Sequence, residues 1–118
     1  MTMSYKSSRR PQLYLGEFEL VVLLAVLRLG TDAYGVTIRE ALEKETSRDV
    51  TLGAVYKTLG RLEQKGYLRV RIGEPTAARG GRRKKLYRLE PLGASALKQS
   101  VAAFRRLTRD LGPELEVL

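Results

Sequence analysis

The chain has 118 residues, of which 43% are apolar and 30% are charged, and this composition is typical of one soluble globular domain. It contains no cysteine and no histidine, which excludes disulfides and thiolate chemistry and removes the commonest metal ligand. We therefore expect no catalytic activity, no metal site and no cofactor. The net charge is +9, and the whole excess lies between Lys57 and Arg88, where eleven basic residues stand against two acidic ones. Such a cluster indicates a polyanionic partner, most simply nucleic acid, with an anionic membrane or mere solubility as the alternatives.

The first part of the chain lacks the pattern of a secretion signal or a membrane span. Residues 1–12 are polar and without periodicity, so we expect a flexible basic arm; a terminus without function is the alternative. The longest apolar run, Leu20–Leu27, has eight residues, far short of a membrane span, and no hydrophobic signal region follows the N-terminal charges. We expect a cytoplasmic protein with no membrane partner.

A first helix is predicted over Leu15–Leu29, ended by Gly30. Its apolar residues cover almost every angle of the helix, which indicates burial on nearly all sides, and a domain of this size cannot easily surround it alone. We therefore expect a second copy of the chain to cover part of it. A second helix is predicted over Ala33–Glu45, capped by Asp32 or Thr31 and with one apolar face.

The third predicted helix begins after Thr51, which can cap it, and ends at Gly66. One of its faces is apolar at helical spacing. The other face collects small, hydroxyl and basic side chains: Gly53, Ala54, Lys57, Thr58, Gly60, Arg61 and Lys65. An interior glycine costs a helix about 1 kcal/mol relative to alanine, so glycine on this face indicates close approach to another molecule, such as the major groove of DNA. Packing of these glycines against another helix is the alternative.

Two strands follow, over Tyr67–Ile72 and Lys84–Glu90, and they are predicted to form an antiparallel hairpin. Pro75 and the Gly80-Gly81 pair supply turn residues between them. Five cations gather towards the tip, and nothing in the hairpin's own fold requires them: Arg79, Arg82, Arg83, Lys84 and Lys85.

A last helix is predicted from Pro91 to about Leu111, where apolar residues recur in alternating steps of four and three. Its natural partner is the first helix, of the same or of a second chain; simple closure of the monomer core is the alternative. The residues expected at a dimer interface lie on these two helices: Phe18, Val22, Leu97, Val101, Phe104, Leu107 and Leu111. The same region can hold an apolar effector, with a filled dimer core as the alternative.

Three helices, a two-stranded hairpin and a trailing helix, in this order, predict a mainly α fold with a small antiparallel hairpin. This is a winged helix-turn-helix followed by a C-terminal dimerisation helix. The expected organisation is a flexible basic arm over residues 1–12, a DNA-binding domain over residues 13–90 and a dimerisation helix over residues 91–118.

Several short motifs span roughly residues 13–100. They are Leu15-Gly16-Glu17-Phe18-Glu19-Leu20, Ala33-Tyr34-Gly35-Val36, Leu52-Gly53-Ala54-Val55-Tyr56, Leu59 with Arg61-Leu62-Glu63, Lys65-Gly66, the wing stretch from Gly80 to Leu89, and Pro91-Leu92-Gly93. In combination they resemble the PadR-like transcriptional regulators, in the compact branch with a single short C-terminal helix. The resemblance implies a homodimeric repressor of palindromic operators, released in some members by a small hydrophobic ligand. Lys57 and Gly60 depart from the family pattern; both are expected to face outward and to bear on the operator sequence rather than on the fold.

We expect the third helix to enter the major groove of duplex DNA. Base-edge and phosphate contacts are expected from Thr51, Gly53, Ala54, Lys57, Thr58 and Arg61, with Lys57 and Arg61 as guanine readers. Tyr34 and Tyr56 can donate to phosphates, and ordinary core tyrosines are the alternative. The hairpin cations are expected to hold phosphates or to reach the minor groove. Binding to RNA and docking to a protein are the alternative functions.

Overall fold

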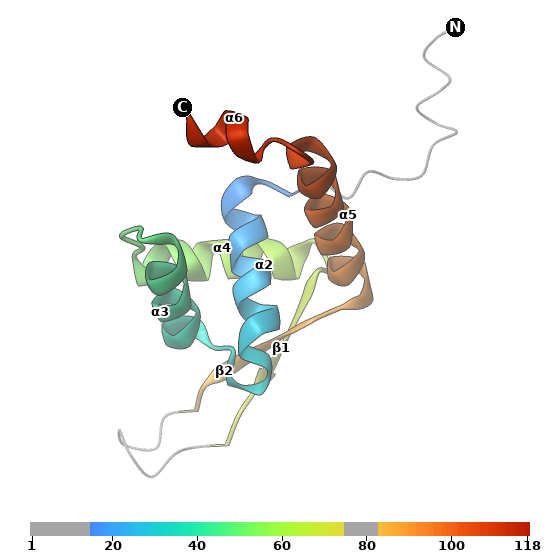
Figure 1. Ribbon diagram of the computed structural model, residues 1–118. Helices are drawn as coiled ribbons and strands as arrows, with labels where there is room; N and C mark the ends of the chain where they lie inside the picture. The colour runs from blue at the N-terminus through green and yellow to red at the C-terminus, as the bar shows by residue number, and fades with distance from the viewer. Residues whose placement is uncertain (1–14, 75–82) are drawn as a thin grey trace, which may run out of the picture.

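The computed structural model describes residues 15–74 and 83–118, and its elements follow one another in the predicted order (Figure 1). They are α2 (Glu17–Leu29), η1 (Gly30–Asp32), α3 (Gly35–Thr46), α4 (Leu52–Gln64), β1 (Leu68–Ile72), β2 (Lys85–Leu89), α5 (Pro91–Thr108) and α6 (Gly112–Glu116). The arm expected over residues 1–12 and the hairpin tip with Arg79 and Arg82 lie outside the described residues.

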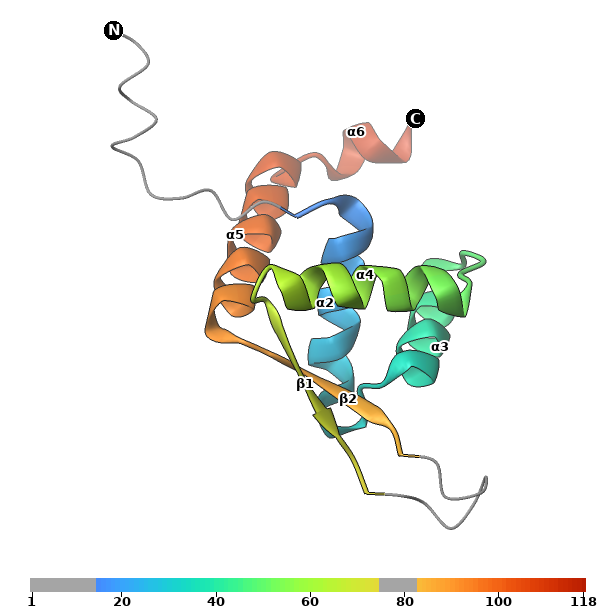
Figure 2. The same ribbon diagram turned by 180° about the vertical axis from the view of Figure 1, so that it is seen from behind.

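The helix-turn-helix consists of α3 and α4, and the hairpin beside it is the wing. β1 pairs antiparallel with β2, from Leu68 opposite Leu89 to Ile72 opposite Lys85. Figure 2 shows α4 crossing α2, with the hairpin continuing from the end of α4. The backbone N–H of Tyr87 donates to the carbonyl of Ala33 at 2.9 Å, which holds the wing against the segment before α3. The predicted winged helix-turn-helix is confirmed.

α2 lies at the centre of the fold and is surrounded mainly by its own chain. α3, α4, β2 and α5 all contact it, and its Val22 and Leu23 are fully buried. Leu97 of α5 is buried in the same core. The expectation that one chain cannot enclose this helix is therefore wrong for most of its faces, because the wing and the first half of α5 cover what the other helices leave open. Val22 and Leu97 are not available to a second chain.

The start of α3 differs from the prediction. Its N-cap is Tyr34, whereas Thr31 and Asp32 belong to the short helix η1 and do not cap it. The hydroxyl of Thr37 accepts a hydrogen bond from the backbone N–H of Tyr34 at 3.0 Å. The side chain of Thr37, inside the first turn, therefore satisfies a backbone N–H that the side chain of Thr31 or Asp32 was expected to satisfy.

The C-terminal helix is shorter than predicted and is followed by a second one. α5 ends at Thr108 instead of continuing to Leu111, and Asp110 has a φ of 61°, in the left-handed region. The helix therefore breaks at Asp110, and a new helix, α6, starts at Gly112 with Pro113 in its first turn, a position where proline is tolerated. Every residue from 104 to 118 is exposed.

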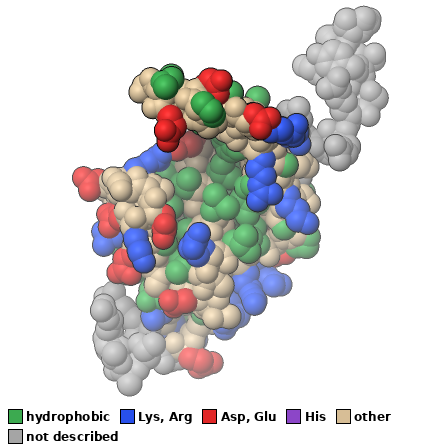
Figure 3. All heavy atoms as spheres, viewed as in Figure 1, with side chains coloured by type: hydrophobic (Ala, Val, Ile, Leu, Met, Phe, Trp, Pro, Cys, Tyr) green, Lys and Arg blue, Asp and Glu red, His purple; other side chains and the backbone are tan. Residues whose placement is uncertain are grey.

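Exposed apolar side chains gather on the face that carries α2 and α5 (Figure 3). Leu27 of α2 is 60% exposed and Leu107 of α5 is 72% exposed. Phe18 and Val101 are half-buried against the core. We call the exposed apolar set the terminal face, and it consists of Leu24, Leu27, Phe104, Leu107, Leu111 and Leu115. Within residues 15–74 and 83–118, every helix is too short or too polar to cross a membrane.

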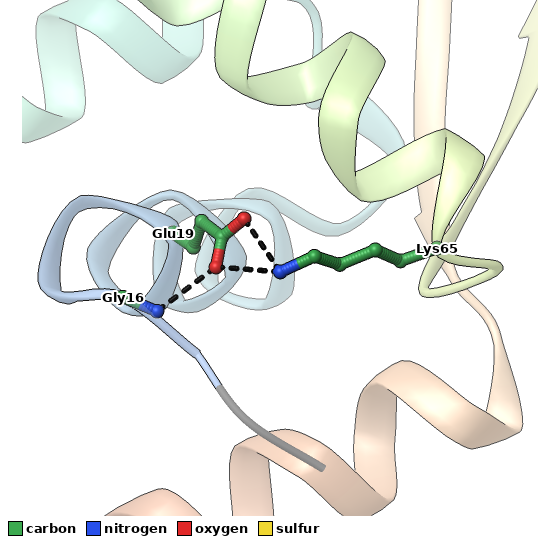
Figure 4. A network of polar contacts seen from close by, with 3 residues as sticks. All are labelled: Gly16, Glu19 and Lys65. Carbon is green, nitrogen blue, oxygen red and sulfur yellow. Dashed lines mark hydrogen bonds and ion pairs between the residues drawn. The ribbon is translucent and has the colours of Figure 1, made fainter.

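A buried carboxylate joins the start of α2 to the end of α4 (Figure 4). Glu19 is 7% exposed, and its side chain accepts hydrogen bonds from the Gly16 backbone at 2.9 Å and from Lys65 Nζ at 2.9 and 2.8 Å. Burial raises the pKa of Glu19, but the hydrogen bonds from Lys65 and Gly16 and the charges of Lys65 and Arg61 outweigh burial. The pKa therefore lies below its ordinary value, and the carboxylate is ionised at neutral pH.

We expect Glu19→Gln to lower the free energy of unfolding at pH 7 by about 1–2 kcal/mol, because the variant loses charge-assisted hydrogen bonds. The lowered pKa means that this stabilisation is complete above the unfolded-state pKa and is lost as pH falls through the folded-state pKa. The difference between wild type and variant should therefore shrink between about pH 7 and pH 3 in urea unfolding followed by circular dichroism. A difference that stays constant over this range contradicts the assignment.

Candidate nucleic-acid interface

The first turn of α4 is held by the cap that the sequence predicts. Thr51 is the N-cap residue, and its hydroxyl accepts a hydrogen bond from the Ala54 backbone N–H at 3.0 Å. Val55, Leu59 and Leu62 anchor the opposite side of α4 in the core. Its buried side thus fixes α4 against the core, while its N-terminal turn remains at the surface.

The outer face of α4 carries most of the side chains predicted for it. Gly53, Ala54, Lys57, Gly60 and Arg61 are all exposed. Thr58 is not among them, because it is only 5% exposed. It lies three residues after Val55 and four before Leu62, so it shares their buried face. Assigning Thr58 to the outer face by its polarity was wrong, and it cannot contact DNA without a rearrangement.

The two glycines of α4 face open space. A Cβ atom built on Gly53 or on Gly60 would meet nothing within 4 Å in the described part of the chain. Within the described residues, neither glycine packs against another helix of its own chain. Their smallness fits a surface that a second molecule approaches closely.

The start of α3 and the middle of α4 meet at a glycine. A Cβ atom on Gly35 would lie 2.4 Å from the hydroxyl oxygen of Tyr56, so the ring of Tyr56 rests directly on this glycine. The ring is nevertheless 44% exposed, which places Tyr56 at the surface rather than in the core. The sequence offered one signal for this contact, a glycine at the first position of α3, and its role was not predicted.

The wing begins beside the same surface. Lys84 Nζ lies 4.3 Å from the ring centroid of the half-buried Tyr34, a cation–π contact that connects the wing to the helix-turn-helix. Arg83 and Lys85 are exposed on either side of Lys84. The structure thus brings Lys84 to Tyr34 and places Tyr56 against Gly35, the residue after Tyr34, while Arg79 and Arg82 lie outside the described residues.

The wing also carries a basic pair that was not predicted as part of the site. Arg69 and Arg88 stand directly opposite each other on β1 and β2, and like charges at such positions disfavour a sheet. A carboxylate of Glu90 lies 3.6 Å from Arg69 and offsets part of this repulsion. The alternation of Arg69 and Arg71 with apolar residues was visible in the sequence, but the pairing with Arg88 depends on the register of the strands.

The buried phenol of Tyr87, on the wing, carries no charge. Burial raises the pKa of Tyr87, and the neighbouring Glu63 and Tyr56 raise it further, so this phenol stays protonated at neutral pH. The described residues contain no group of three or more carboxylates placed to hold a metal ion. An open groove of about 610 Å³ lies at the base of the wing between Gly66 and Leu92. None of the residues expected around an apolar effector lines it.

Comparison with known proteins identifies the family of this fold. The model of the transcriptional regulator PadR-like family matches residues 23–99. A PadR-like transcription factor structure from Bacteroides fragilis has 26% identity and a TM-score of 0.62, covering 80% of this chain and 85% of its own. A PadR family regulator from Clostridium difficile R20291 has 22% identity and a TM-score of 0.63, covering 81% and 97%. A transcriptional regulator from Clostridium thermocellum has 22% identity and a TM-score of 0.63, covering 80% and 89%. No curated protein matches the chain significantly.

We expect Gly60→Ala to have opposite effects on stability and on DNA binding. Alanine adds about 1 kcal/mol of helix propensity in the open space around residue 60, so the variant should unfold at a higher urea concentration. The added methyl group should at the same time weaken binding to duplex DNA in a fluorescence anisotropy titration, because it widens the helix where the groove approaches it. Gly112→Ala, in the equally open first turn of α6, is the matched control and should leave DNA binding unchanged. Tighter DNA binding by Gly60→Ala would contradict the predicted approach.

Proposed function

Because the chain belongs to the PadR-like family of transcriptional regulators, which implies DNA binding, we propose that it is a homodimeric repressor that reads a palindromic operator in duplex DNA. The observation that carries this proposal is the outer face of α4. Its N-terminal turn is capped, exposed and lined by residues too small to obstruct a groove, and exposed Lys57 and Arg61 follow on the same helix.

In this proposal α4 enters the major groove with its N-terminal half leading. Thr51, Gly53 and Ala54 bring the backbone close to the phosphates and base edges. Lys57 and Arg61 match the O6 and N7 acceptors of guanine. Tyr56 rests on Gly35 with its ring half exposed, so that its hydroxyl can donate to a phosphate. Tyr34 has the same role from the N-cap of α3.

The wing supplies contacts that position the protein without reading sequence. Arg83, Lys84 and Lys85 hold phosphates or reach the adjacent minor groove, together with Arg79 and Arg82 of the tip. The cation–π contact between Lys84 and Tyr34 supports this role, because it ties the base of the wing to the surface from which α4 projects.

The proposed two-fold operator requires a dimer, and we place its interface at the terminal face. The exposed leucines of α2 and of the segment from Phe104 to Leu118 form an apolar surface unsuited to water, and a second copy of the chain can cover it. The two α4 helices of such a dimer would read half-sites about 34 Å apart, one turn of the duplex. Phe18 and Val101 beside this face are the residues at which a small hydrophobic effector would release the operator.

We expect the wild-type protein to select palindromic duplexes from a random pool and to bind them with a strong salt dependence. If the dimer neutralises about six to ten phosphates, its affinity should fall about 10³–10⁵-fold between 50 and 200 mM salt. A flat salt dependence, or equal binding to RNA duplexes, would refute the proposal.

Two arginine variants serve as internal controls in the same binding assay. Arg61→Ala should relax the preference at one base position, whereas Arg83→Ala should weaken all duplexes about equally and reduce the salt slope by about one. Indistinguishable effects of the two variants would remove the proposed division between reading and positioning.

We expect Leu107→Glu to convert the dimer into a monomer in analytical ultracentrifugation, because it puts a charge into the apolar terminal face. Binding to the full palindrome should weaken far more than binding to a single half-site. Ile72→Glu is the matched control, since Ile72 is also exposed and apolar but lies on the wing. If both variants remain dimeric, the terminal face is not the interface.

A further inference from the structure

Glu19 is the one charged side chain that is buried within residues 15–74 and 83–118. Its three hydrogen bonds tie it to its own helix start at Gly16 and to Lys65, 46 positions further along the chain. A buried carboxylate is costly unless it is paired, so hydrophobic packing alone does not account for Glu19 at this position. The question is what the pair holds in place.

Lys65 stands at the C-terminal end of α4, one helical turn after Arg61 and at the opposite end from the capped N-terminal turn. It is the C-cap residue of α4, whereas Thr51 caps the opposite end. The Nζ atom of Lys65 also lies 5.7 Å from the ring centroid of Tyr67, the buried residue that leads into β1. The carbonyl of Tyr67 accepts a hydrogen bond at 2.9 Å from the backbone N–H of Glu90, the residue just before α5 begins. The ammonium group therefore sits where α2, the end of α4 and the start of the wing meet.

The geometry of a helix makes its far end sensitive to this attachment. α4 has 13 residues and is therefore about 20 Å long. A tilt of about 5° at Lys65 would displace the N-terminal turn by roughly 2 Å over that length. In a two-fold dimer both helices tilt symmetrically, so the distance between the two N-terminal turns of α4 can change by up to twice that amount. This is comparable with the 3.4 Å that separates successive bases along one DNA strand.

We infer that the Glu19–Lys65 ion pair is a positioning device that fixes the tilt of α4 against α2, and thereby sets the spacing of the half-sites that the dimer accepts. The inference rests on the proposed function, since it requires DNA binding through α4 and a dimer built on α2 and α5. Glu19 and Lys65 act here through α4, and Glu19 itself touches no DNA.

Other roles for Glu19 predict different results. If the carboxylate only repelled DNA phosphates, its removal would tighten binding to every duplex. If it only stabilised the fold, its removal would leave the preference among operators unchanged at temperatures where the protein stays folded. A loss of spacing preference without a general gain in affinity is specific to the positioning role.

The test compares operators whose half-sites are separated by the selected spacing or by one base pair more or less. We expect Glu19→Gln to reduce the preference for the selected spacing by about twofold or more, which corresponds to the lower end of the coupling between contacting residues. Glu17→Gln is the matched control, because Glu17 lies on the same helix and pairs with Arg48 at the exposed surface. It should keep the wild-type preference, since exposed pairs contribute little.

Variants at the other partner keep the test decisive if Glu19→Gln does not fold. Lys65→Arg retains a cation for the carboxylate and should keep the spacing preference, whereas Lys65→Met should lose it. Equal spacing preferences in all folded variants would overturn the inference. If the wild type binds no duplex DNA, or binds as a monomer, the proposed function itself fails and the inference falls with it.

A second measurement needs no DNA. The chain has no cysteine, so Ala54→Cys introduces a single site for a spin label on the exposed first turn of α4. We expect a narrow distribution of distances between the two labels in the dimer, and a broader or shifted distribution when Glu19→Gln is added. An unchanged distribution in a stable dimer would overturn the positioning role even if DNA binding were altered.

Discussion

The structure depends on the burial of α2 by the rest of its own chain. This helix is apolar on almost all sides, and α3, α4, the wing strand β2 and α5 each cover one part of it. Each of those elements is thereby held by the same central surface. The helix-turn-helix, the wing and the C-terminal helix therefore keep fixed relative positions.

This arrangement separates two surfaces with different chemistry. α4 lies across one side of α2, and the terminal face lies on the side where α2 and α5 are seen together (Figures 1 and 2). The outer face of α4 is lined by small, polar and basic side chains, and the terminal face is rich in leucine. A chain of this size can thus carry a basic surface and an apolar surface on different sides of α2.

Much of this was predictable from the sequence, because periodicity alone reports which side of a helix is apolar. The order of the elements, the Thr51 cap and the basic outer face of α4 followed from local patterns. Thr58 was assigned to the outer face because it is polar, although its position along the helix places it on the buried face. Val22 was assigned to the dimer interface because the pattern of a wholly apolar helix does not show whether its own chain or a second chain covers it. The Thr37 hydrogen bond at the start of α3, the pairing of Arg69 with Arg88 and the Glu19–Lys65 ion pair join residues whose proximity depends on backbone geometry or on tertiary structure. Spacing in the sequence could not report them.

The glycines divide the molecule into positions that can diverge and positions that cannot. At Gly93 a Cβ atom would lie 2.2 Å from the Tyr67 carbonyl oxygen, a backbone atom that cannot move aside, so this joint between the wing and α5 requires glycine. At Gly53, by contrast, a Cβ atom would meet no other atom of the described residues within 4 Å, so a side chain can be added there without a clash at its first atom. Under the proposed function, substitutions on the outer face of α4 can therefore change the DNA sequence that is bound, while the joint at Gly93 stays unchanged. The fold itself separates what evolution can vary from what it must conserve.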